Sequence, residues 1–331
     1  MGGWWAVGVR ALVIGGTRFI GRRIVEDMVA RGDEVTVVHR GDTEPPDLVE
    51  CEHLHCARAD FAGVADRIRA WRPDAIVDTL AMTRAGAEAV LPHLPDAALV
   101  MLSSMDVYRA FGLVLSEGEG EPVPVDEDSP VRSERYPYRG RGERDDDYDK
   151  LDVEPLYLAR GAAVLRLAMI YGEHDPQRRE EFILRRVRAG RARIPIGSGS
   201  WLWTRCYVGD VARAVLAAVD HPQAGAGHIF NVGEPVARSM RGWAEQIIAA
   251  AGHDAQLVTV PDERVTEDMW ITRSVAQHLL FTSHRAADLL GWRAGDAAEA
   301  LTRSVRWHLA HPPADASTDF SADDAALELA D

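Results

Sequence analysis

The spacing of apolar residues in the first third of the chain is the feature that most constrains its fold. From residue 9 to about residue 107, short runs rich in β-branched residues alternate with amphipathic helical stretches. This alternation predicts strand–helix–strand units, which build a parallel sheet covered by helices. We expect strands at residues 11–14, 34–38, 51–55, 75–77, 98–103, 163–167 and 228–232, and helices at 20–31 and 64–71. The expected fold class is α/β, with a doubly wound parallel sheet.

The rest of the chain predicts a smaller lobe and two irregular segments. Residues 115–147 are rich in glycine, proline and charge and too long for an ordinary connection, so they are either partly disordered or, as we favour, a functional lid. We assign residues 8–175 and 206–233 to the sheet domain. Residues 176–205 and 234–311 should form a lobe over the carboxyl edge of the sheet, where open α/β sheets bind ligands. Residues 312–331 are acidic and weakly patterned, which indicates a flexible tail.

The net charge of −15 limits the partners that the chain can bind. Phosphate backbones and anionic membranes are bound by clustered cations, so we expect neither nucleic acid nor a membrane as a partner. No apolar stretch approaches the length of a membrane-spanning helix, and the first residues lack the basic segment of a signal peptide. The sequence therefore predicts a cytoplasmic protein.

The three cysteines are too few and too scattered for a disulfide framework. Cys51, His53, His55 and Cys56 together have side chains of the types that bind metals. Because successive residues of a strand point to opposite faces, His53 and His55 should oppose Cys56 across the sheet. We expect no metal site and free thiols.

A glycine-rich segment follows the first expected strand and opens a helix. Gly15 permits a tight turn, the helix start offers free N–H groups and a positive dipole to a pyrophosphate, and Gly21 lets helix and strand pack closely. The residues expected at the cofactor in this segment are Gly15, Thr17, Arg18, Phe19, Ile20 and Gly21. Dinucleotide binding by a Rossmann domain is the prediction.

The end of the second expected strand bears on the choice between the two nicotinamide cofactors. An acidic residue there would bind the ribose hydroxyls, whereas an arginine can accommodate a 2′-phosphate. His39 and Arg40 occupy this place, and the nearest acid, Asp42, follows a glycine. We expect NADP, with NAD as the second choice. Alternatively, Arg40 is a solvated charge and Asp42 turns inward.

Lys150 is the only lysine among 37 lysine and arginine residues. A chain that uses arginine for every other positive side chain retains lysine where a compact, rotatable ammonium is needed, so Lys150 is the first candidate for chemistry. Alternatively, it is an ordinary surface residue.

Several motifs in a fixed order resemble those of the extended short-chain dehydrogenase/reductase superfamily, specifically its NAD(P)-dependent epimerase/dehydratase branch. The resemblance covers the chain to about residue 312. It rests on the glycine segment, on Asp60 after the third strand, and on the segments at 103–108, 166–172, 207–212 and 230–233. It implies hydride transfer to or from a hydroxyl or carbonyl group of a sugar-like substrate, which in some members of the family is linked to a nucleotide.

The resemblance also implies roles for individual residues. A serine and a tyrosine bond the reacting oxygen, and a lysine holds the nicotinamide ribose; Ser104 and Lys150 match two of these. The resemblance and the lobe's arginine cluster place the remaining candidates, namely Asp60 and Phe61 at the cofactor and Met105, Arg178 and Arg205 at the substrate. By analogy with relatives, we expect a homodimer.

The tyrosine of the family motif is displaced. The position four residues before Lys150, on the same helical face, holds Asp146. Tyr148 stands two residues before the lysine, about 200° around a regular helix, and can serve only if the helix begins after it. Pro155 hints at such an irregular start.

Three hypotheses remain open. The first is an enzyme that uses Ser104, Tyr148 and Lys150. The second gives proton transfer to a carboxylate, with Asp146 as the main candidate. The third is a non-catalytic protein that binds or senses the dinucleotide and has lost the acid/base tyrosine.

Overall fold

The main sheet has seven parallel strands in the order β10-β6-β5-β4-β1-β2-β3. The computed structural model describes residues 8–118, 120–142 and 144–328. The strands are β1 (Arg10–Ile14), β2 (Glu34–His39), β3 (Glu52–His55), β4 (Ala75–Asp78), β5 (Ala98–Ser104), β6 (Ala163–Leu167) and β10 (Ile229–Val232). Every boundary lies within one residue of the prediction, and the doubly wound α/β fold class is confirmed.

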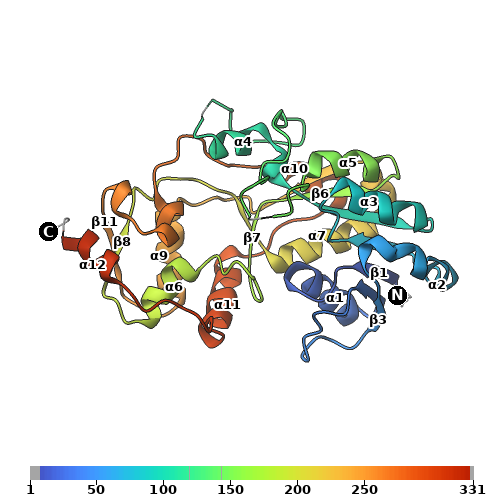
Figure 1. Cartoon of the computed structure of the whole chain (residues 1–331), viewed down its shortest axis with the longest axis horizontal. Helices are drawn as coiled ribbons and strands as arrows, with labels where there is room; N and C mark the ends of the chain where they lie inside the picture. The colour runs from blue at the N-terminus through green and yellow to red at the C-terminus, as the bar shows by residue number, and fades with distance from the viewer. Residues whose placement is uncertain (1–7, 119, 143, 329–331) are drawn as a thin grey trace, which may run out of the picture.

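Helices cover both faces of this sheet (Figure 1). Ala11 and Val13 of β1 pack into one core with α1 (Phe19–Arg31) and α7 (Val208–Asp220). Leu12 and Ile14 of the same strand pack into the other core with α2 (Ala65–Trp71), α3 (Arg84–Val90) and α5 (Lys150–Leu158). This alternation of side chains along a strand buries β1 on both faces, which is typical of a parallel sheet. Within the described residues, no helix is long and apolar enough to cross a bilayer.

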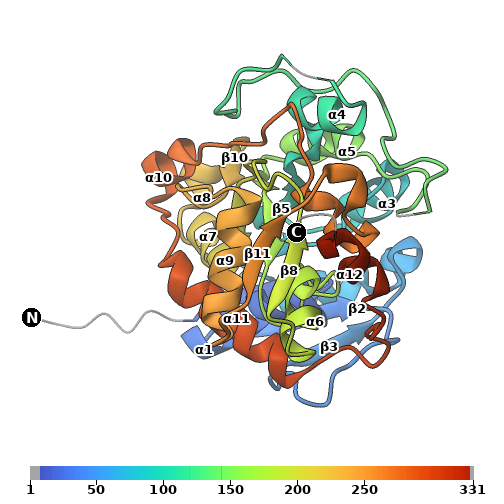
Figure 2. The same cartoon turned by 90° about the vertical axis from the view of Figure 1, so that its left-hand side faces the viewer.

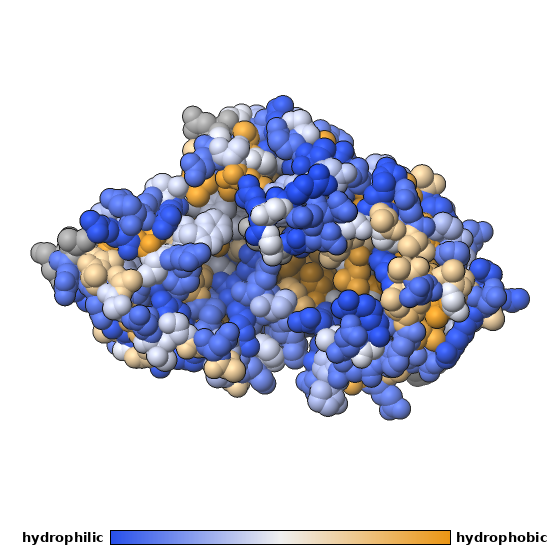
Figure 3. Space-filling model, viewed as in Figure 1, coloured by the Kyte–Doolittle hydropathy of each residue, from blue (hydrophilic) through white to orange (hydrophobic). Residues whose placement is uncertain are grey.

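A second lobe lies beside the sheet domain and is seen from its own side in Figure 2. It contains a small parallel sheet of β8 (Arg193–Ile196) with β11 (Gln256–Thr259). A second small parallel sheet, β7 (Met169–Tyr171) with β9 (Arg205–Tyr207), lies between the two lobes (Figure 1). The main helices of the second lobe are α6 (Glu181–Arg188), α9 (Met240–Ala250) and α11 (Ala297–Ala310). The surface is hollowed between the two lobes, with apolar residues in the hollow (Figure 3).

The remaining elements are short. They are the α-helices α4 (Arg109–Leu115), α8 (Pro222–Gly225), α10 (His284–Leu290) and α12 (Ser321–Glu328), and the 3-10 helices η1 (Arg58–Val64), η2 (Leu91–His93), η3 (Met105–Val107), η4 (Asp262–Arg264) and η5 (Glu267–Thr272).

The structure differs from the expected flexible tail at α12. Asp323 of this helix is buried, and its two carboxylate oxygens each accept a hydrogen bond of 2.7 Å from Arg186 of α6. Ala326 and Leu327 are also buried. Composition alone suggested disorder, but a buried arginine elsewhere in the chain needs a carboxylate partner, and this helix supplies one. Residues 329–331 lie outside the described residues.

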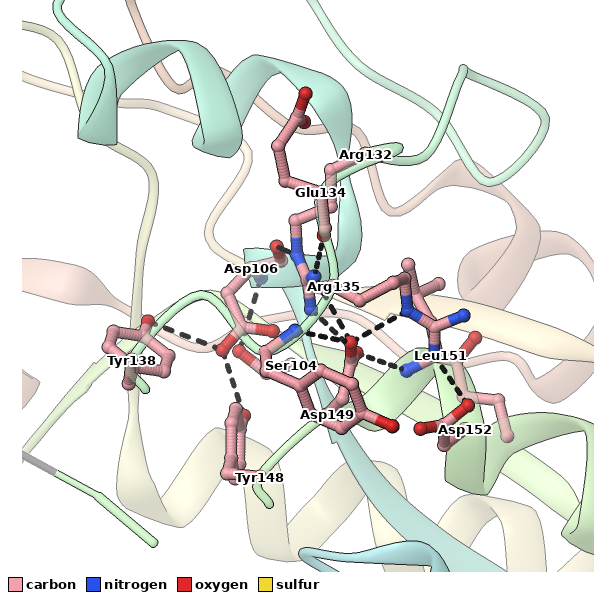
Figure 4. Close-up of polar contacts among 12 residues, drawn as sticks. Ser104, Asp106, Arg132, Glu134, Arg135, Tyr138, Tyr148, Asp149, Leu151 and Asp152 are labelled. Carbon is pink, nitrogen blue, oxygen red and sulfur yellow. Dashed lines mark hydrogen bonds and ion pairs between the residues drawn. The ribbon is translucent and has the colours of Figure 1, made fainter. Parts of the chain in front are cut away.

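A buried carboxylate joins the long segment after α4 to the start of α5 (Figure 4). Asp149 is the N-cap of α5, and its Oδ1 accepts from Leu151 N at 3.0 Å and from Arg132 Nη2 at 2.8 Å. Its Oδ2 accepts from Arg135 Nε at 2.8 Å and from Tyr136 N at 2.9 Å. Arg132 and Asp149 side chains are fully buried. The described part of the segment is therefore fixed where it meets the helix that carries Lys150.

Protonation of Asp149 should destabilise the fold. These hydrogen bonds and the two arginines outweigh its burial and lower the pKa of Asp149 to about 2, below the value of about 3.9 in an unfolded chain. A depressed folded pKa contributes stability above the unfolded value and loses it as the pH falls toward the folded value. We expect Asp149→Asn to remove about 2 kcal/mol of the decrease in unfolding free energy between about pH 5 and about pH 2.

The measurement is urea unfolding as a function of pH for the wild type, Asp149→Asn and Asp147→Asn. Asp147 has a side chain that is 77% exposed, so its variant should follow the wild-type profile. A profile of Asp149→Asn with the same slope as the wild type would contradict this role.

Candidate active site

The segment between β1 and α1 has the geometry of a phosphate-binding turn. Gly15 has φ +91°, and its N–H donates to Val38 O at 2.9 Å. A Cβ on Gly15 would lie 2.5 Å from Thr79 Oγ1, and a Cβ on Gly21 would lie 1.9 Å from Gly15 O. Both positions therefore require glycine, one for its conformation and one for the close packing of helix on strand.

The start of α1 is open to an anion. Arg18 is its N-cap, with an extended backbone and no side-chain hydrogen bond to the helix, so the first amides of α1 are not satisfied by a cap. The Arg18 side chain is exposed, whereas Thr17 is buried and its hydroxyl lies 3.3 Å from that of Thr43. Phe19, at φ +36°, and Ile20 are half-buried in the first turn. This cradle fits a dinucleotide pyrophosphate.

The end of β2 holds the other residues expected at the cofactor. His39 is buried, and Arg40 is exposed and pairs with Asp42 at 3.1 Å. Asp60 is exposed in η1, and Phe61 beside it is buried. Arg40 and Asp42 thus satisfy each other on the surface, and Asp42 does not turn inward.

Lys150 is the first residue of α5, and its side chain is buried. Its ammonium donates to Ala81 O at 2.8 Å and to Leu102 O at 2.9 Å, which joins the segment after β4 to β5. Burial lowers the pKa of Lys150 to about 8. The amine lies inside the protein beneath the carboxyl edge of the sheet, which is the edge where cofactors bind in this fold class.

Tyr148 precedes α5 because the helix begins only at Lys150. Tyr148 is therefore not held on the far side of a regular helix, and the Lys150 ammonium is 5.9 Å from the centre of its ring. Tyr148 is buried, and its hydroxyl donates to Asp106 Oδ2 at 2.8 Å (Figure 4). Burial, and then the charge of Asp106, raises the pKa of Tyr148 well above its usual value.

Asp106 lies at the centre of this cluster, although it is not among the site residues expected from the sequence. It is buried in η3, directly after β5, and its Oδ1 has no hydrogen-bond partner among the described residues. Tyr138 of the long segment also donates to its Oδ2, at 3.4 Å. Its place within the segment at 103–108, two residues after Ser104, was the signal that could have identified it.

Ser104 ends β5 and lies beside Asp106 (Figure 4). Its hydroxyl accepts from Asp106 N at 3.2 Å, which caps η3 and leaves the hydroxyl hydrogen available to donate. Met105, the next residue, is buried. Ser104, at the end of β5, therefore lies in one cluster with Asp106, Tyr148 and Lys150, although more than 40 residues separate it from the last two.

Asp146 lies apart from this cluster. It is exposed, its Oδ1 accepts from Gly140 N at 2.8 Å, and its carbonyl accepts from Arg139 at 3.2 Å. The four-residue spacing from Lys150 does not place the two side chains on one helical face, since α5 starts after Asp146.

The two arginines expected at the substrate, Arg178 and Arg205, have different surroundings. Arg178 donates to His311 O at 2.8 Å, at the end of α11. Arg205 is buried on β9, with its guanidinium 4.3 Å from the centre of the Trp243 ring and its Nε without a partner among the described residues. Burial lowers the pKa of Arg205 to about 10. Arg205 retains a donor to offer, whereas Arg178 is engaged locally.

Comparisons with known proteins agree with the fold and with the motifs of the sequence. Residues 156–233 match the model of the NAD dependent epimerase/dehydratase family. The chain is 26% identical over 338 residues to a chloroplast stem-loop binding protein of 41 kDa from Arabidopsis thaliana, covering 96% of this chain and 84% of that protein. It is 23% identical over 279 residues to a 4-hydroxy-2-methyl-3-oxo-4-farnesyl-3,4-dihydroquinoline-1-oxide ketoreductase from Stigmatella aurantiaca, covering 76% of each.

Among solved structures, the fold is similar to UDP-glucose-4-epimerase from Stenotrophomonas maltophila, which was crystallised with NAD and formylated UDP-arabinopyranose. The TM-score is 0.68 at 20% identity, with 91% of this chain and 97% of that chain covered. The family match, the order of the motifs and the strand order confirm the resemblance. The chain thus resembles the NAD dependent epimerase/dehydratase family, whose model matches residues 156–233.

Proposed function

We propose that the protein catalyses NAD(P)-dependent hydride transfer at a hydroxyl or carbonyl carbon of a sugar-like substrate, as an epimerase, dehydratase or reductase. The observation that supports this most is the meeting of Ser104, Tyr148 and Lys150 around Asp106 beside the glycine cradle. A protein that only stored or sensed a dinucleotide would need the cradle but not this buried acid/base cluster.

The residues of the cradle fit the cofactor that the family uses. Gly15 and Gly21 hold the turn open where any Cβ would collide, and the first amides of α1 would receive the pyrophosphate. When bound, the nicotinamide supplies the acceptor or donor of hydride. Lys150 would hold the adjoining ribose by exchanging one of its carbonyl partners, Ala81 O or Leu102 O, for a ribose hydroxyl.

Tyr148 and Asp106 provide a route for the proton. Burial and a hydrogen-bonded carboxylate raise the pKa of Tyr148 rather than lower it, so the phenol does not ionise by itself near neutral pH. When a substrate hydroxyl is oxidised, Tyr148 can accept its proton while it passes its own proton to Asp106 Oδ2. In the reverse direction the same proton returns, and Ser104 holds the reacting oxygen by donating to it.

A nucleotide-linked sugar is the substrate class that we propose. The structurally similar epimerase contains a uridine-diphosphate sugar, and the Nε of Arg205 has no hydrogen-bond partner among the described residues. A guanidinium is well suited to a diphosphate within an otherwise acidic molecule. Binding to a nucleic-acid stem-loop, as the Arabidopsis protein is named for, is not proposed because the net charge of −15 opposes it.

NADP is the proposed cofactor because Arg40 follows His39 at the end of β2 and can turn from Asp42 to a 2′-phosphate. We expect Arg40→Ala to weaken NADPH binding about tenfold, since an exposed charge-assisted hydrogen bond is lost, and to leave NADH binding nearly unchanged. Fluorescence titration of both reduced cofactors measures this. An equal change for both cofactors, or none, would favour the alternative in which Arg40 is a solvated charge.

The proton route predicts the behaviour of two variants. Tyr148→Phe and Asp106→Asn should each lower kcat by about 100-fold or more, since each removes one member of the relay. The assay follows cofactor reduction and hydride exchange with a panel of uridine-diphosphate sugars, using both NADP and NAD. Cofactor affinity and thermal midpoint should stay close to those of the wild type.

Asp146→Asn separates this relay from the alternative in which Asp146 is the base. With the relay, the Asp146 variant keeps the wild-type kcat because its carboxylate holds only the local turn. Loss of turnover in Asp146→Asn with normal turnover in Asp106→Asn would reverse the assignment. Tight cofactor binding with no turnover in the wild type would instead support the non-catalytic hypothesis.

A further inference from the structure

A cluster of three histidines and a glutamate lies at the edge of the sheet, on β2, on β3 and in the segment between them. His39, Glu44, His53 and His55 each offer one ligand atom, and these atoms all lie within 4.8 Å of one another. We propose that this cluster is a binding site for Zn²⁺ or a chemically similar divalent transition metal, in addition to the site where the reaction takes place.

The strand register brings the three imidazoles together. In the parallel pair, His39 of β2 is opposite His55 of β3, and Val37 is opposite His53. Residues two apart on a strand share a face, so His53 and His55 point to the same side as His39. Leu54, between the two histidines of β3, is buried on the other side. The strand backbones therefore place the three histidines on one face of the sheet.

The distances suit a metal with nitrogen and oxygen ligands. His39 Nε2 is 2.8 Å from His53 Nδ1 and 3.3 Å from Glu44 Oε1, and His53 Nδ1 is 3.9 Å from the same oxygen. His55 Nε2 contacts this oxygen directly. Two ligands of a tetrahedral zinc lie about 3.4 Å apart, given bonds of about 2.0–2.1 Å. Small rotations of the exposed Glu44 and His55 side chains bring the atoms to this spacing.

The chemistry of the donors also suits zinc. Glu44 supplies one negative charge. Cys51 Sγ lies 3.5 Å from His53 Nε2, on the side of the ring away from the cluster, so it can orient this ligand as an outer partner. Three imidazoles and one carboxylate form a borderline donor set that favours Zn²⁺, Co²⁺ or Cu²⁺ over Mg²⁺ or Ca²⁺.

His39 is the ligand that must rearrange. Its Nδ1 accepts from Gly41 N at 3.1 Å, which places the ring proton on Nε2, the atom that faces the cluster. Binding through Nε2 would move this proton to Nδ1, against the Gly41 amide. Glu44, His53 and His55 are therefore the primary ligands. His39 takes the fourth position when the Gly41 amide turns away, which the glycine backbone allows at φ +88°.

Zinc titration of the full chain, without a histidine tag and freed of metal by a chelator, tests this site. We expect one Zn²⁺ per chain by calorimetry, and Co²⁺ in its place should show the intense d–d absorption of tetrahedral coordination. His55→Ala and Glu44→Gln should each weaken zinc binding by more than about tenfold, because removing a ligand costs at least as much as removing an outer partner.

The control variant is His284→Ala, which removes one exposed histidine elsewhere, at the start of α10. It should keep the wild-type affinity for zinc. His55 and Glu44 are exposed, so their variants should fold, and equal thermal midpoints in chelator would verify this. Zinc should then raise the midpoint of the wild type and of His284→Ala more than that of the two site variants.

Either of two results would overturn the proposal. One is a wild-type chain with no zinc affinity above that of His55→Ala and Glu44→Gln. The other is weak binding of several ions that falls equally in His284→Ala, which would show scattered surface histidines. Neither result bears on hydride transfer, because the titration contains no cofactor or substrate.

Discussion

The buried carboxylate of Asp149 is the constraint on which the arrangement of the site depends. A carboxylate removed from water requires several donors, and it obtains them from Arg132, Arg135 and two backbone amides. These donors come from the long segment and from the first turn of α5. Because Asp149 caps the helix, Lys150 becomes its first residue and Tyr148 stays outside it.

The same constraint explains how a displaced tyrosine can remain at the site. With Tyr148 just before the cap, its hydroxyl reaches Asp106, while the Lys150 ammonium reaches Ala81 O after β4 and Leu102 O of β5. Arg132 also donates to the backbone oxygen of Asp106 at 2.8 Å. The arginine that pairs with Asp149 therefore also holds the backbone of Asp106. The proposed relay and the helix cap are thus parts of one buried polar network, in which each group satisfies another.

The sheet could be predicted from sequence almost to the residue because its strands are buried and bounded by turns. Patterns of apolar residues report such burial directly. The residues of the site were harder to predict from the sequence. Spacing along a regular helix suggested Asp146, but the start of α5 depends on Asp149 meeting Arg132, a contact between positions 17 residues apart. Asp106 was overlooked because a carboxylate in a motif shows its role only when Tyr148 and Tyr138 are seen to converge on it.

The histidine cluster also depends on contacts that the sequence of one strand does not reveal. Strand alternation correctly separates His53 and His55 from Cys56, whose thiol contacts Ala57 O instead. Alternation along β3 alone does not reveal that His39 of β2 lies alongside through the strand register, or that Glu44 of the following loop lies close to it. In the same way, the order of the C-terminal helix α12 depends on the contact between Asp323 and Arg186, which are 137 residues apart. Local composition cannot indicate a partner that only the fold supplies.

The central claim is that Lys150 and Tyr148 flank the nicotinamide. A crystal structure of the full chain with NADP bound tests it most directly. The account predicts the Lys150 ammonium within about 3.2 Å of a hydroxyl of the nicotinamide ribose, with the Tyr148 hydroxyl facing the reactive side of the ring. A dinucleotide bound elsewhere, with Lys150 still held only by Ala81 O and Leu102 O, would contradict it.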